Sequence, residues 1–390
     1  MRWPRCVGSR HCAAAFVTAQ RFWSLRRRLL GNEQRRSEES GCAVATIAPA
    51  RASTTPERTN IEVMEQRTLG RTGRKVSVIG LGTWQLGADW GNVDEAEALA
   101  VLDAAVAAGV TFFDTADVYG DGRSEQLIGR YLKENTGADI LVATKMGRRV
   151  EQLPENYVLE NFRAWTDRSR KNLDVERLDL VQLHCPPTSV FSSDAVFDAL
   201  DTLVAEDRIA NYGVSVEKCD EALAAISRPG TASVQIILNA FRLKPLQRVL
   251  PAAAAAGVGI IARVPLASGL LSGRYTKEST FGADDHRNYN RQGAAFDVGE
   301  TFSGVDFATG VEAAQDFAAL LPEGVSPAQG ALRWIIQQPG VTSAIPGARN
   351  AEQAAKNADA AAVPALSDDV LAGISALYDS KIKAQVSERW

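Results

Sequence analysis

Four side chains suited to acid–base chemistry end or follow three apolar runs of the sequence. The run "FFDTADVYG" carries Asp114 and Tyr119, "LVATK" ends in Lys145, and "LDLVQLH" ends in His184. A phenol with its ordinary pKa of about 10 keeps its proton at neutral pH and donates it reluctantly. A nearby ammonium would favour the phenolate, a carboxylate would orient that ammonium, and an imidazole could hydrogen-bond a carbonyl oxygen. Together these groups could protonate an oxygen that is acquiring negative charge.

Each residue also has an ordinary structural explanation. Tyr119 could pack on the surface of a Gly-rich turn, Lys145 could extend its ammonium into solvent, and His184 could be a hydrogen-bonded core histidine. The three runs are consecutive predicted strands, however, and after residue 63 the chain has only one other histidine, His286. Convergence at neighbouring strand ends therefore favours a site.

The elements that would position these residues follow a regular rhythm. Apolar runs at 76–83, 110–116, 140–145, 178–184, 209–216, 233–241, 257–266 and 341–348 alternate with helical patterns at 95–108, 124–134, 156–172, 193–206, 218–226, 246–256, 326–338 and 350–362. Strands that are apolar on both faces, each followed by a helix, indicate a parallel sheet covered by helices. Eight such units over roughly 300 residues predict an α/β fold, a single-domain (β/α)8 TIM barrel. An open dinucleotide-binding sheet is disfavoured because "GLGTWQ", at 80–85, lacks the third glycine of that fingerprint.

Two further features fall where a barrel places its site, at the C-terminal ends of the strands. A long charged connection, 267–310, is either a lid over a ligand or a surface insertion. After the last run, "IPGARN" offers Gly347 for close backbone approach, Arg349 to grip a phosphate, and a helix start near Asn350. Protonating a carbonyl oxygen does not by itself reduce the carbonyl, because a hydride must also be supplied. No side chain supplies a hydride, so a bound cofactor is needed. The alternative is an ordinary loop in which Asn350 caps the helix.

The composition separates a short leader from the body of the chain. The protein has 390 residues, 45% hydrophobic and 23% charged, with a net charge of −4, which argues against nucleic-acid binding. Residues 1–63 nevertheless carry eleven Arg, no Lys and five Glu, and Met64 resembles a natural start. We expect 1–63 to be a disordered leader, a cleavable targeting segment or an upstream-start extension, and 64–390 to form the barrel.

Cysteine usage and hydropathy bound the location. The body contains only Cys185 and Cys219, without metal-ligand spacing, so we expect neither a disulfide framework nor a metal site. A reducing, cytoplasmic compartment is expected, or an organelle if the leader is a genuine transit peptide. The longest apolar region, 251–271, is interrupted by Arg263, so no membrane association is expected. The expected partner is a small molecule, and no pattern speaks to oligomeric state.

The motifs "FFDTADVYG", "LVATK", "LDLVQLHCPP", "YGVSV", "SVQIILN" and "AIPGARNAEQAAKN" occur in this order. With this order and spacing, from about Glu65 to the C-terminal helix, the chain resembles the aldo-keto reductases. The resemblance implies a (β/α)8 barrel that reduces aldehydes and ketones with NADPH. It implies Tyr119 as general acid, Lys145 as the group that tunes it, Asp114 as the partner of Lys145, and His184 as the group that orients the carbonyl.

The resemblance also implies a cofactor site that runs across the barrel. Its residues would be Thr83 and Trp84 after the first strand, Asp114, Ser215 and Gln235 at the nicotinamide carboxamide, Leu266, Ser268 and Gly269 along the pyrophosphate, and Gly347, Arg349, Gln353 and Asn357 at the adenosine phosphate. Arg349 would favour the 2′-phosphate of NADPH.

Two positions depart from the family pattern. Val216 replaces a frequent Asn, which removes one carboxamide hydrogen bond, and Arg263 replaces an aromatic residue that stacks on the nicotinamide. A guanidinium plane can also stack, and both departures are typical of the bacterial-type branch that the chain resembles.

A second function is compatible with the same resemblance. The family includes potassium-channel β subunits, which bind NADPH and act mainly as partner proteins. Short-chain dehydrogenases, which use a Tyr-x-x-x-Lys pair, are excluded because no tyrosine here has a lysine four residues later.

Overall fold

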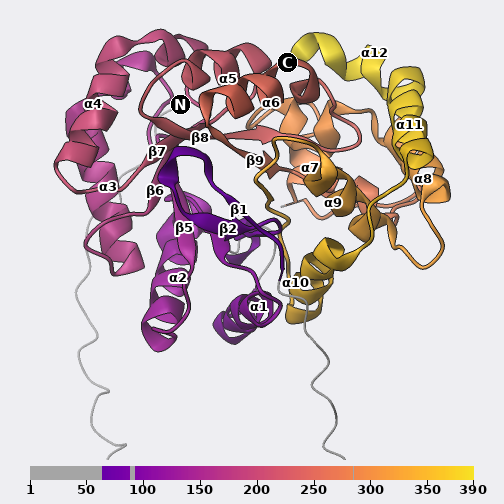
Figure 1. Ribbon diagram of the computed structural model, residues 1–390, viewed down its shortest axis with the longest axis horizontal. Helices are drawn as coiled ribbons and strands as arrows, with labels where there is room; N and C mark the ends of the chain where they lie inside the picture. Colours follow the sequence, from indigo (N-terminus) through magenta and orange to yellow (C-terminus); the bar gives the residue numbers. More distant parts are fainter. Residues whose placement is uncertain (1–63, 88–92, 284) are drawn as a thin grey trace, which may run out of the picture. The chain divides into compact units, whose positions relative to one another are not determined.

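The computed structural model describes residues 64–87, 93–283 and 285–390, so the predicted leader lies outside the described residues. The centre is an eight-stranded parallel sheet in the order β10-β9-β8-β7-β6-β5-β4-β3 (Figure 1). The strands are β3 (Leu81–Gly82), β4 (Phe112–Asp114), β5 (Leu141–Met146), β6 (Leu180–His184), β7 (Tyr212–Ser215), β8 (Thr231–Ile237), β9 (Gly259–Arg263) and β10 (Ser343–Ala344).

The sheet closes on itself between its first and last strands. Ile79 pairs with Ala344, and Gly82 with Gly347, as parallel bridges. The amide N–H of Gly80 donates to the carbonyl of Ala344 over 2.8 Å. A closed sheet with a helix after nearly every strand is the (β/α)8 barrel that the sequence predicted.

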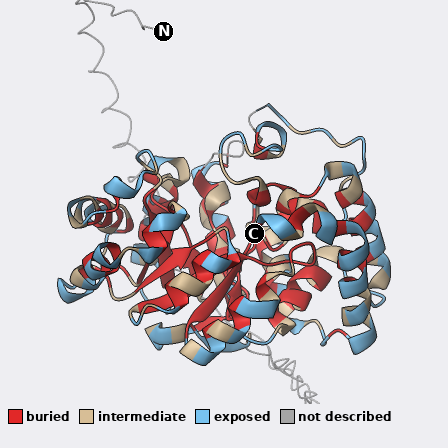
Figure 2. Cartoon of the chain, turned by 90° about the horizontal axis from the view of Figure 1, so that it is seen from above, coloured by how far each residue is buried: buried red, intermediate tan, exposed pale blue. Residues whose placement is uncertain are grey.

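Helices surround the barrel and expose one face to solvent, while the strands are buried (Figure 2). The helices are α1 (Glu95–Ala107), α2 (Arg123–Glu134), α3 (Leu159–Leu173), α4 (Asp194–Ala205), α5 (Cys219–Ile226), α6 (Pro245–Ala256), α7 (His286–Tyr289), α8 (Phe307–Leu320), α9 (Pro327–Gln337), α10 (Ala351–Ala358), α11 (Asp368–Leu377) and α12 (Lys383–Val386). The helical patterns found in the sequence correspond to α1–α6, α9 and α10. No residue range was predicted for α7, α8, α11 or α12.

The first predicted strand, 76–83, divides into two elements. Its beginning, β2 (Lys75–Ser77), pairs antiparallel with β1 (Gln66–Thr68), and only Leu81–Gly82 joins the barrel as β3. The apolar pattern is continuous because both parts are buried, so periodicity could not locate the break. Leu69, between β1 and β2, and Val76 pack with inward-facing barrel residues, so this hairpin covers one end of the barrel interior.

Inward-facing side chains change character along the strands. Leu141, Ala143 and Leu180 belong to the apolar cluster inside the barrel. Because alternate residues of a strand share a face, Lys145 and His184 point to the same interior nearer the C-terminal ends. The apolar layer fills the barrel, and the polar layer above it forms the floor of the site.

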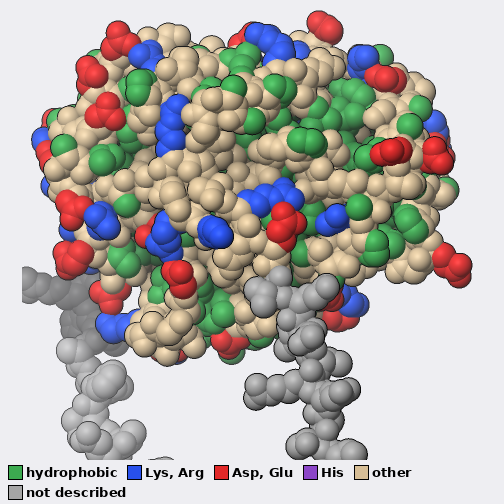
Figure 3. Space-filling view, in the orientation of Figure 1, with side chains coloured by type: hydrophobic (Ala, Val, Ile, Leu, Met, Phe, Trp, Pro, Cys, Tyr) green, Lys and Arg blue, Asp and Glu red, His purple; other side chains and the backbone are tan. Residues whose placement is uncertain are grey.

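Acidic and basic side chains are interspersed on the face seen in Figure 3. No helix among the described residues combines the length and the apolar content that a membrane span requires.

Candidate active site

Lys145 joins the predicted catalytic residues into one group. Its Nζ lies 2.6 Å from Oδ2 of Asp114 and 3.2 Å from the phenolic oxygen of Tyr119, and donates to the carbonyl of Thr115 over 2.8 Å. The His184 ring packs edge-on against the Tyr119 ring, with centroids 6.0 Å apart. The structure therefore brings together the four residues selected from three strand ends.

Asp114 is held on every side by polar groups. Gln235 and Gln182 donate to its Oδ1 over 2.7 and 3.2 Å, and Thr83 Oγ1 donates to its backbone carbonyl over 2.9 Å. The side chains of Asp114 and Lys145 are 4% and 1% exposed. A buried ion pair with all its hydrogen bonds made fixes the position of both partners.

The turn that carries Tyr119 depends on glycine. Gly120 has φ of 59°, and a Cβ there would lie 2.0 Å from the carbonyl oxygen of Gly87. Asp121 follows with φ of 55°, and both Arg149 and Arg168 pair with its carboxylate. The left-handed backbone at Gly120 and the two arginine contacts with Asp121 therefore stabilise the sharp turn that follows β4.

Burial and charge both act on the pKa of Tyr119. Desolvation, with the charges of Asp114 and Glu300, raises this pKa above its ordinary value, while Lys145 lowers it, in the expected direction, but by less. Burial lowers the pKa of Lys145, but Asp114 and Tyr119 raise it by more. The pKa therefore lies above its ordinary value, and the ammonium stays charged. Burial, with the charges of Arg148, Lys145 and Arg263, holds the pKa of His184 well below its ordinary value. The site thus contains a protonated phenol, an ammonium and a neutral imidazole.

Aromatic residues form one wall beside the phenol. Trp84 stacks on Tyr119 with centroids 6.0 Å apart, and contacts His286 at 5.5 Å and Phe296 at 5.8 Å. His286 and Phe296 belong to the long connection after β9. This connection therefore shapes the site, as the lid interpretation of 267–310 predicted.

A cavity of about 710 Å³ runs from Tyr119 and His184 to the start of α10. It is lined by all of the predicted site residues except Lys145, which lies behind Asp114 and Tyr119; these are Thr83, Trp84, Asp114, Tyr119, His184, Ser215, Gln235, Arg263, Leu266, Ser268, Gly269, Gly347, Arg349, Gln353 and Asn357.

The far end of the cavity suits a phosphorylated ligand. Arg349 lies directly before α10 and Lys356 lies in its last turn; both line the cavity, as does Arg274. A Cβ at Gly347 would lie 2.3 Å from the side-chain amide of Gln85, so a larger residue would displace that side chain from the cavity wall. An extended cavity with cations at one end and hydrogen-bonding side chains at the other fits a dinucleotide.

Several predicted cofactor residues bond to one another in this structure. Gln353 accepts from the backbone N–H of Arg349 over 3.0 Å, and Asn357 donates to the carbonyl of Gly347 over 3.2 Å. Asn350 caps α10 by accepting from the N–H of Gln353. Asn350 therefore caps the helix while Gly347 and Arg349 line the cavity, so the ordinary-loop and binding-site alternatives for this segment are compatible.

Arg263, the departure from the aromatic pattern, is held by protein groups. Its Nη2 donates to Oε1 of Glu217 over 2.7 Å and to the carbonyl of Val216 over 3.1 Å. The guanidinium is therefore fixed at the cavity wall.

Sequence reasoning missed a further set of cavity residues. They are Gln85, Cys185, Arg274, Tyr275, Phe281, His286, Arg287, Glu300 and Lys356. Most lie in the long connection after β9, where no periodic pattern in the sequence marks which side chains face the cavity. In the sequence, the length and charge of this connection were the features that indicated a contribution to the site.

The barrel and its acid–base group define an oxidoreductase of the carbonyl-reducing class. The chain belongs to the aldo/keto reductase family, whose model matches residues 78–379. It is 32% identical over 295 residues to an aldo-keto reductase of Bacillus subtilis, covering 73% of this chain and 85% of that protein. It is 30% identical over 353 residues to the "Probable voltage-gated potassium channel subunit beta" of Oryza sativa subsp. japonica, covering 84% of this chain and 100% of that protein.

A solved structure supports the same fold. The glycerol dehydrogenase of Gluconobacter oxydans matches with a TM-score of 0.67 and 26% identity, covering 83% of this chain and 97% of that chain.

Proposed function

We propose that the protein reduces aldehydes and ketones to alcohols with NADPH, with Tyr119 as the general acid. The observation that carries the proposal is the position of Lys145 Nζ, which contacts both Asp114 and Tyr119 at 2.6 and 3.2 Å. The chain's own residues can thus supply a proton next to a group that stabilises the resulting phenolate.

The proposed roles follow from charge and position. NADPH, when bound, supplies the hydride. His184, as a neutral imidazole, hydrogen-bonds the carbonyl oxygen and directs it toward the phenol. Tyr119 gives its proton to that oxygen, and Lys145 offsets the charge left on the phenolate. Asp114 touches Lys145 and keeps its ammonium in place.

The cofactor assignment rests on Arg349, directly before α10, and on Lys356 in the last turn of that helix, both of which line the cavity. Arg349 is the group proposed to pair with the 2′-phosphate, with Ser215 and Gln235 at the nicotinamide end. Gln235 now donates to Asp114, which leaves its side-chain carbonyl as the acceptor available for a carboxamide N–H. The proposed roles of Thr83, Trp84, Leu266, Ser268, Gly269, Gly347, Gln353 and Asn357 are contacts along the same cofactor.

We extend the proposal to the domain organisation and the location of the protein. We propose that 64–390 is the catalytic barrel and that 1–63 is a leader. Both Cys185 and Cys219 are free thiols, which supports a reducing compartment, the cytoplasm or an organelle.

The extent of the rice match, 100% of a protein described as a channel subunit, supports a second candidate function. In that function the barrel binds NADPH and serves as a partner protein with little turnover. Absorbance at 340 nm, with NADPH and a panel from 4-nitrobenzaldehyde to aliphatic ketones, separates the two. Steady NADPH oxidation supports the reductase; NADPH binding without oxidation of any substrate in the panel supports the partner protein.

A further inference from the structure

Four charged side chains form a cluster beside the proposed catalytic group. Arg148 Nη2 lies 2.9 Å from Glu300 Oε1, and Arg263 Nη2 lies 2.7 Å from Glu217 Oε1. Two longer contacts of 3.8 Å, Arg148 to Glu217 and Arg263 to Glu300, link the pairs. All four side chains are at most 19% exposed.

The cluster is assembled from segments far apart in the sequence. Arg148 follows β5, Glu217 follows β7, Arg263 ends β9, and Glu300 comes from the long connection after β9. The backbone at Glu300 is fixed because its carbonyl accepts from Ser268 Oγ over 3.0 Å. The long connection thus places one carboxylate among groups that belong to the barrel.

Glu300 and Arg263 line the same cavity as Tyr119 and His184. Burial raises the pKa of Glu300, but Arg148 and Arg263 outweigh it and lower the value to about 2. The charge of Glu300 contributes to the raised pKa of Tyr119. The negative charge of Glu300 therefore acts electrostatically on a substrate bound next to Tyr119.

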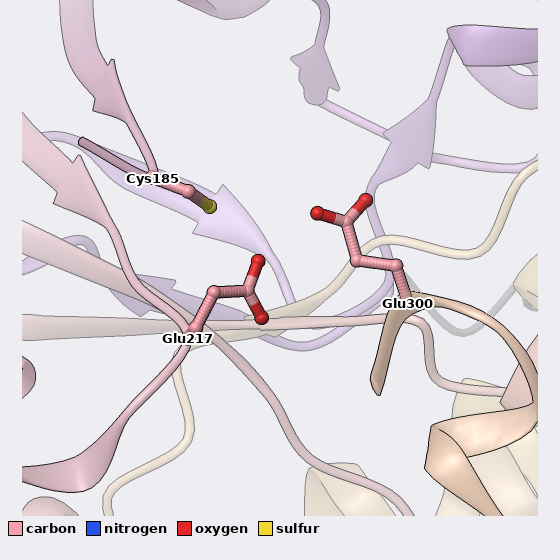
Figure 4. Close-up of side chains that lie close together, drawn as sticks. All are labelled: Cys185, Glu217 and Glu300. Carbon is pink, nitrogen blue, oxygen red and sulfur yellow. The ribbon is translucent and has the colours of Figure 1, made fainter. Parts of the chain in front are cut away.

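The second carboxyl of the cluster, Glu217, has a different pKa. Burial first, then the charge of Glu300, raises the pKa of Glu217 to about 7, against the opposing effect of Arg263. Glu217 is therefore only partly ionised near neutral pH, whereas Glu300 keeps its negative charge. Figure 4 shows them facing each other, with the Cys185 thiol alongside.

A metal site is the other interpretation of this group. Ligand atoms of Cys185, Glu217 and Glu300 lie within 4.8 Å of one another. Two guanidinium cations already pair with the carboxylates, however, and burial raises the pKa of the Cys185 thiol to about 12, which disfavours a thiolate ligand. This donor set fits a charge network better than a metal.

A guanidinium group at a cavity wall is a common receptor for a carboxylate; Arg263 lines this cavity, and Arg148 pairs with Glu300 beside it. We propose that Glu300 determines the charge specificity of this site: it occupies Arg148 and Arg263 as a built-in anion, so the enzyme accepts uncharged carbonyl compounds and rejects those bearing a carboxylate. The inference rests on the proposed reductase function and names the substrate class of that site.

The test compares two matched substrates. With NADPH at 340 nm, kcat/KM is measured for 4-carboxybenzaldehyde and for its uncharged ester, methyl 4-formylbenzoate. Wild type prefers the ester, and Glu300→Gln, which keeps the side-chain shape, raises the acid-to-ester ratio at least tenfold. An unchanged ratio overturns the proposal.

Further variants identify the receptor. Adding Arg148→Gln to Glu300→Gln removes the gain, because the released guanidinium is lost. If Glu300→Gln does not fold, Glu217→Gln at pH 8 removes one negative charge from the same cluster and raises the ratio in the same direction. Glu312→Gln, which removes an exposed carboxylate paired with Lys277 on α8, leaves the ratio as in wild type.

A binding measurement separates this inference from the proposed function. If wild type reduces neither aldehyde, the reductase assignment fails, and benzoate titration followed by tryptophan fluorescence still reports the charge preference. Benzoate binds Glu300→Gln at least tenfold more tightly than wild type; equal affinities overturn the inference.

Discussion

The Nζ of Lys145 lies 3.2 Å from the phenolic oxygen of Tyr119, inside the buried end of a (β/α)8 barrel. The contact couples the proton of the phenol to a cation that is held in place by Asp114 and the carbonyl of Thr115. Burial keeps the phenol protonated, and Lys145 reduces the energy needed to remove that proton at the moment of transfer.

Replacing Tyr119 with Phe should lower kcat for carbonyl reduction by about 10²–10⁴-fold, because the proton donor is lost while the ring remains. NADPH binding, followed by its fluorescence, should persist. Tyr131→Phe on α2, which packs against Phe113 away from the cavity, is the matched control and should keep wild-type activity. Activity of Tyr119→Phe close to wild type would assign the proton to another group.

Lys145→Met should lower kcat and move the alkaline limb of the pH–rate profile to higher pH. Lys145 lowers the pKa of Tyr119, so its removal lets that pKa rise further, and the phenol stays protonated to higher pH. A limb that moves to lower pH would contradict this arrangement.

The same substitution strands the Asp114 carboxylate and should destabilise the fold by about 3–5 kcal/mol. Adding Asp114→Asn should recover part of that stability in urea unfolding without recovering activity. Lys133→Met, at an exposed pair with Asp174, is the control for losing a lysine.

Arg349→Ala should weaken NADPH binding at least tenfold, about 1.4 kcal/mol, and leave NADH binding nearly unchanged. The reason is that only NADPH carries the 2′-phosphate proposed to pair with this guanidinium. Dissociation constants for both cofactors measure the effect, with Arg248→Ala on α6 as an exposed control. Equal losses for both cofactors would remove the 2′-phosphate role from Arg349.

Asp117→Asn should stabilise the protein at alkaline pH. The Asp117 carboxyl is buried two residues before Tyr119, and burial first, then the charge of Glu125, raises its pKa from 3.8 to about 7 despite Arg149 and Arg168. A raised carboxyl pKa contributes stability that is present below pH 3.8 and lost as the pH rises through about 7.

The Asn variant does not ionise, so its stability relative to wild type should increase by about 2–3 kcal/mol between pH 5 and pH 8. Urea unfolding at both values measures this. Asp121→Asn should show no such gain, because Arg149 and Arg168 lower the pKa of that carboxyl. A pH-independent difference for Asp117→Asn would show that this carboxyl does not retain its proton.

Local sequence determined the barrel and the acid–base group. Eight buried runs, each short and apolar on both faces, could be satisfied only by a sheet covered with helices, and a parallel barrel then places Asp114, Lys145 and His184 at one end. The sequence also indicated which end of the site is proposed to bind a phosphate, because Gly347 and Arg349 are suitable residue types and lie just before a helix.

Tertiary structure alone decided how these groups behave. Whether Tyr119 is more or less acidic depends on the balance of burial against Lys145, which is set by packing and not by residue type. The cluster of Arg148, Glu217, Arg263 and Glu300 was invisible in the sequence because its members are separated by 37 to 152 positions. Long-range contacts of this kind carry no periodicity, so only the folded chain shows that Glu300 reaches the site.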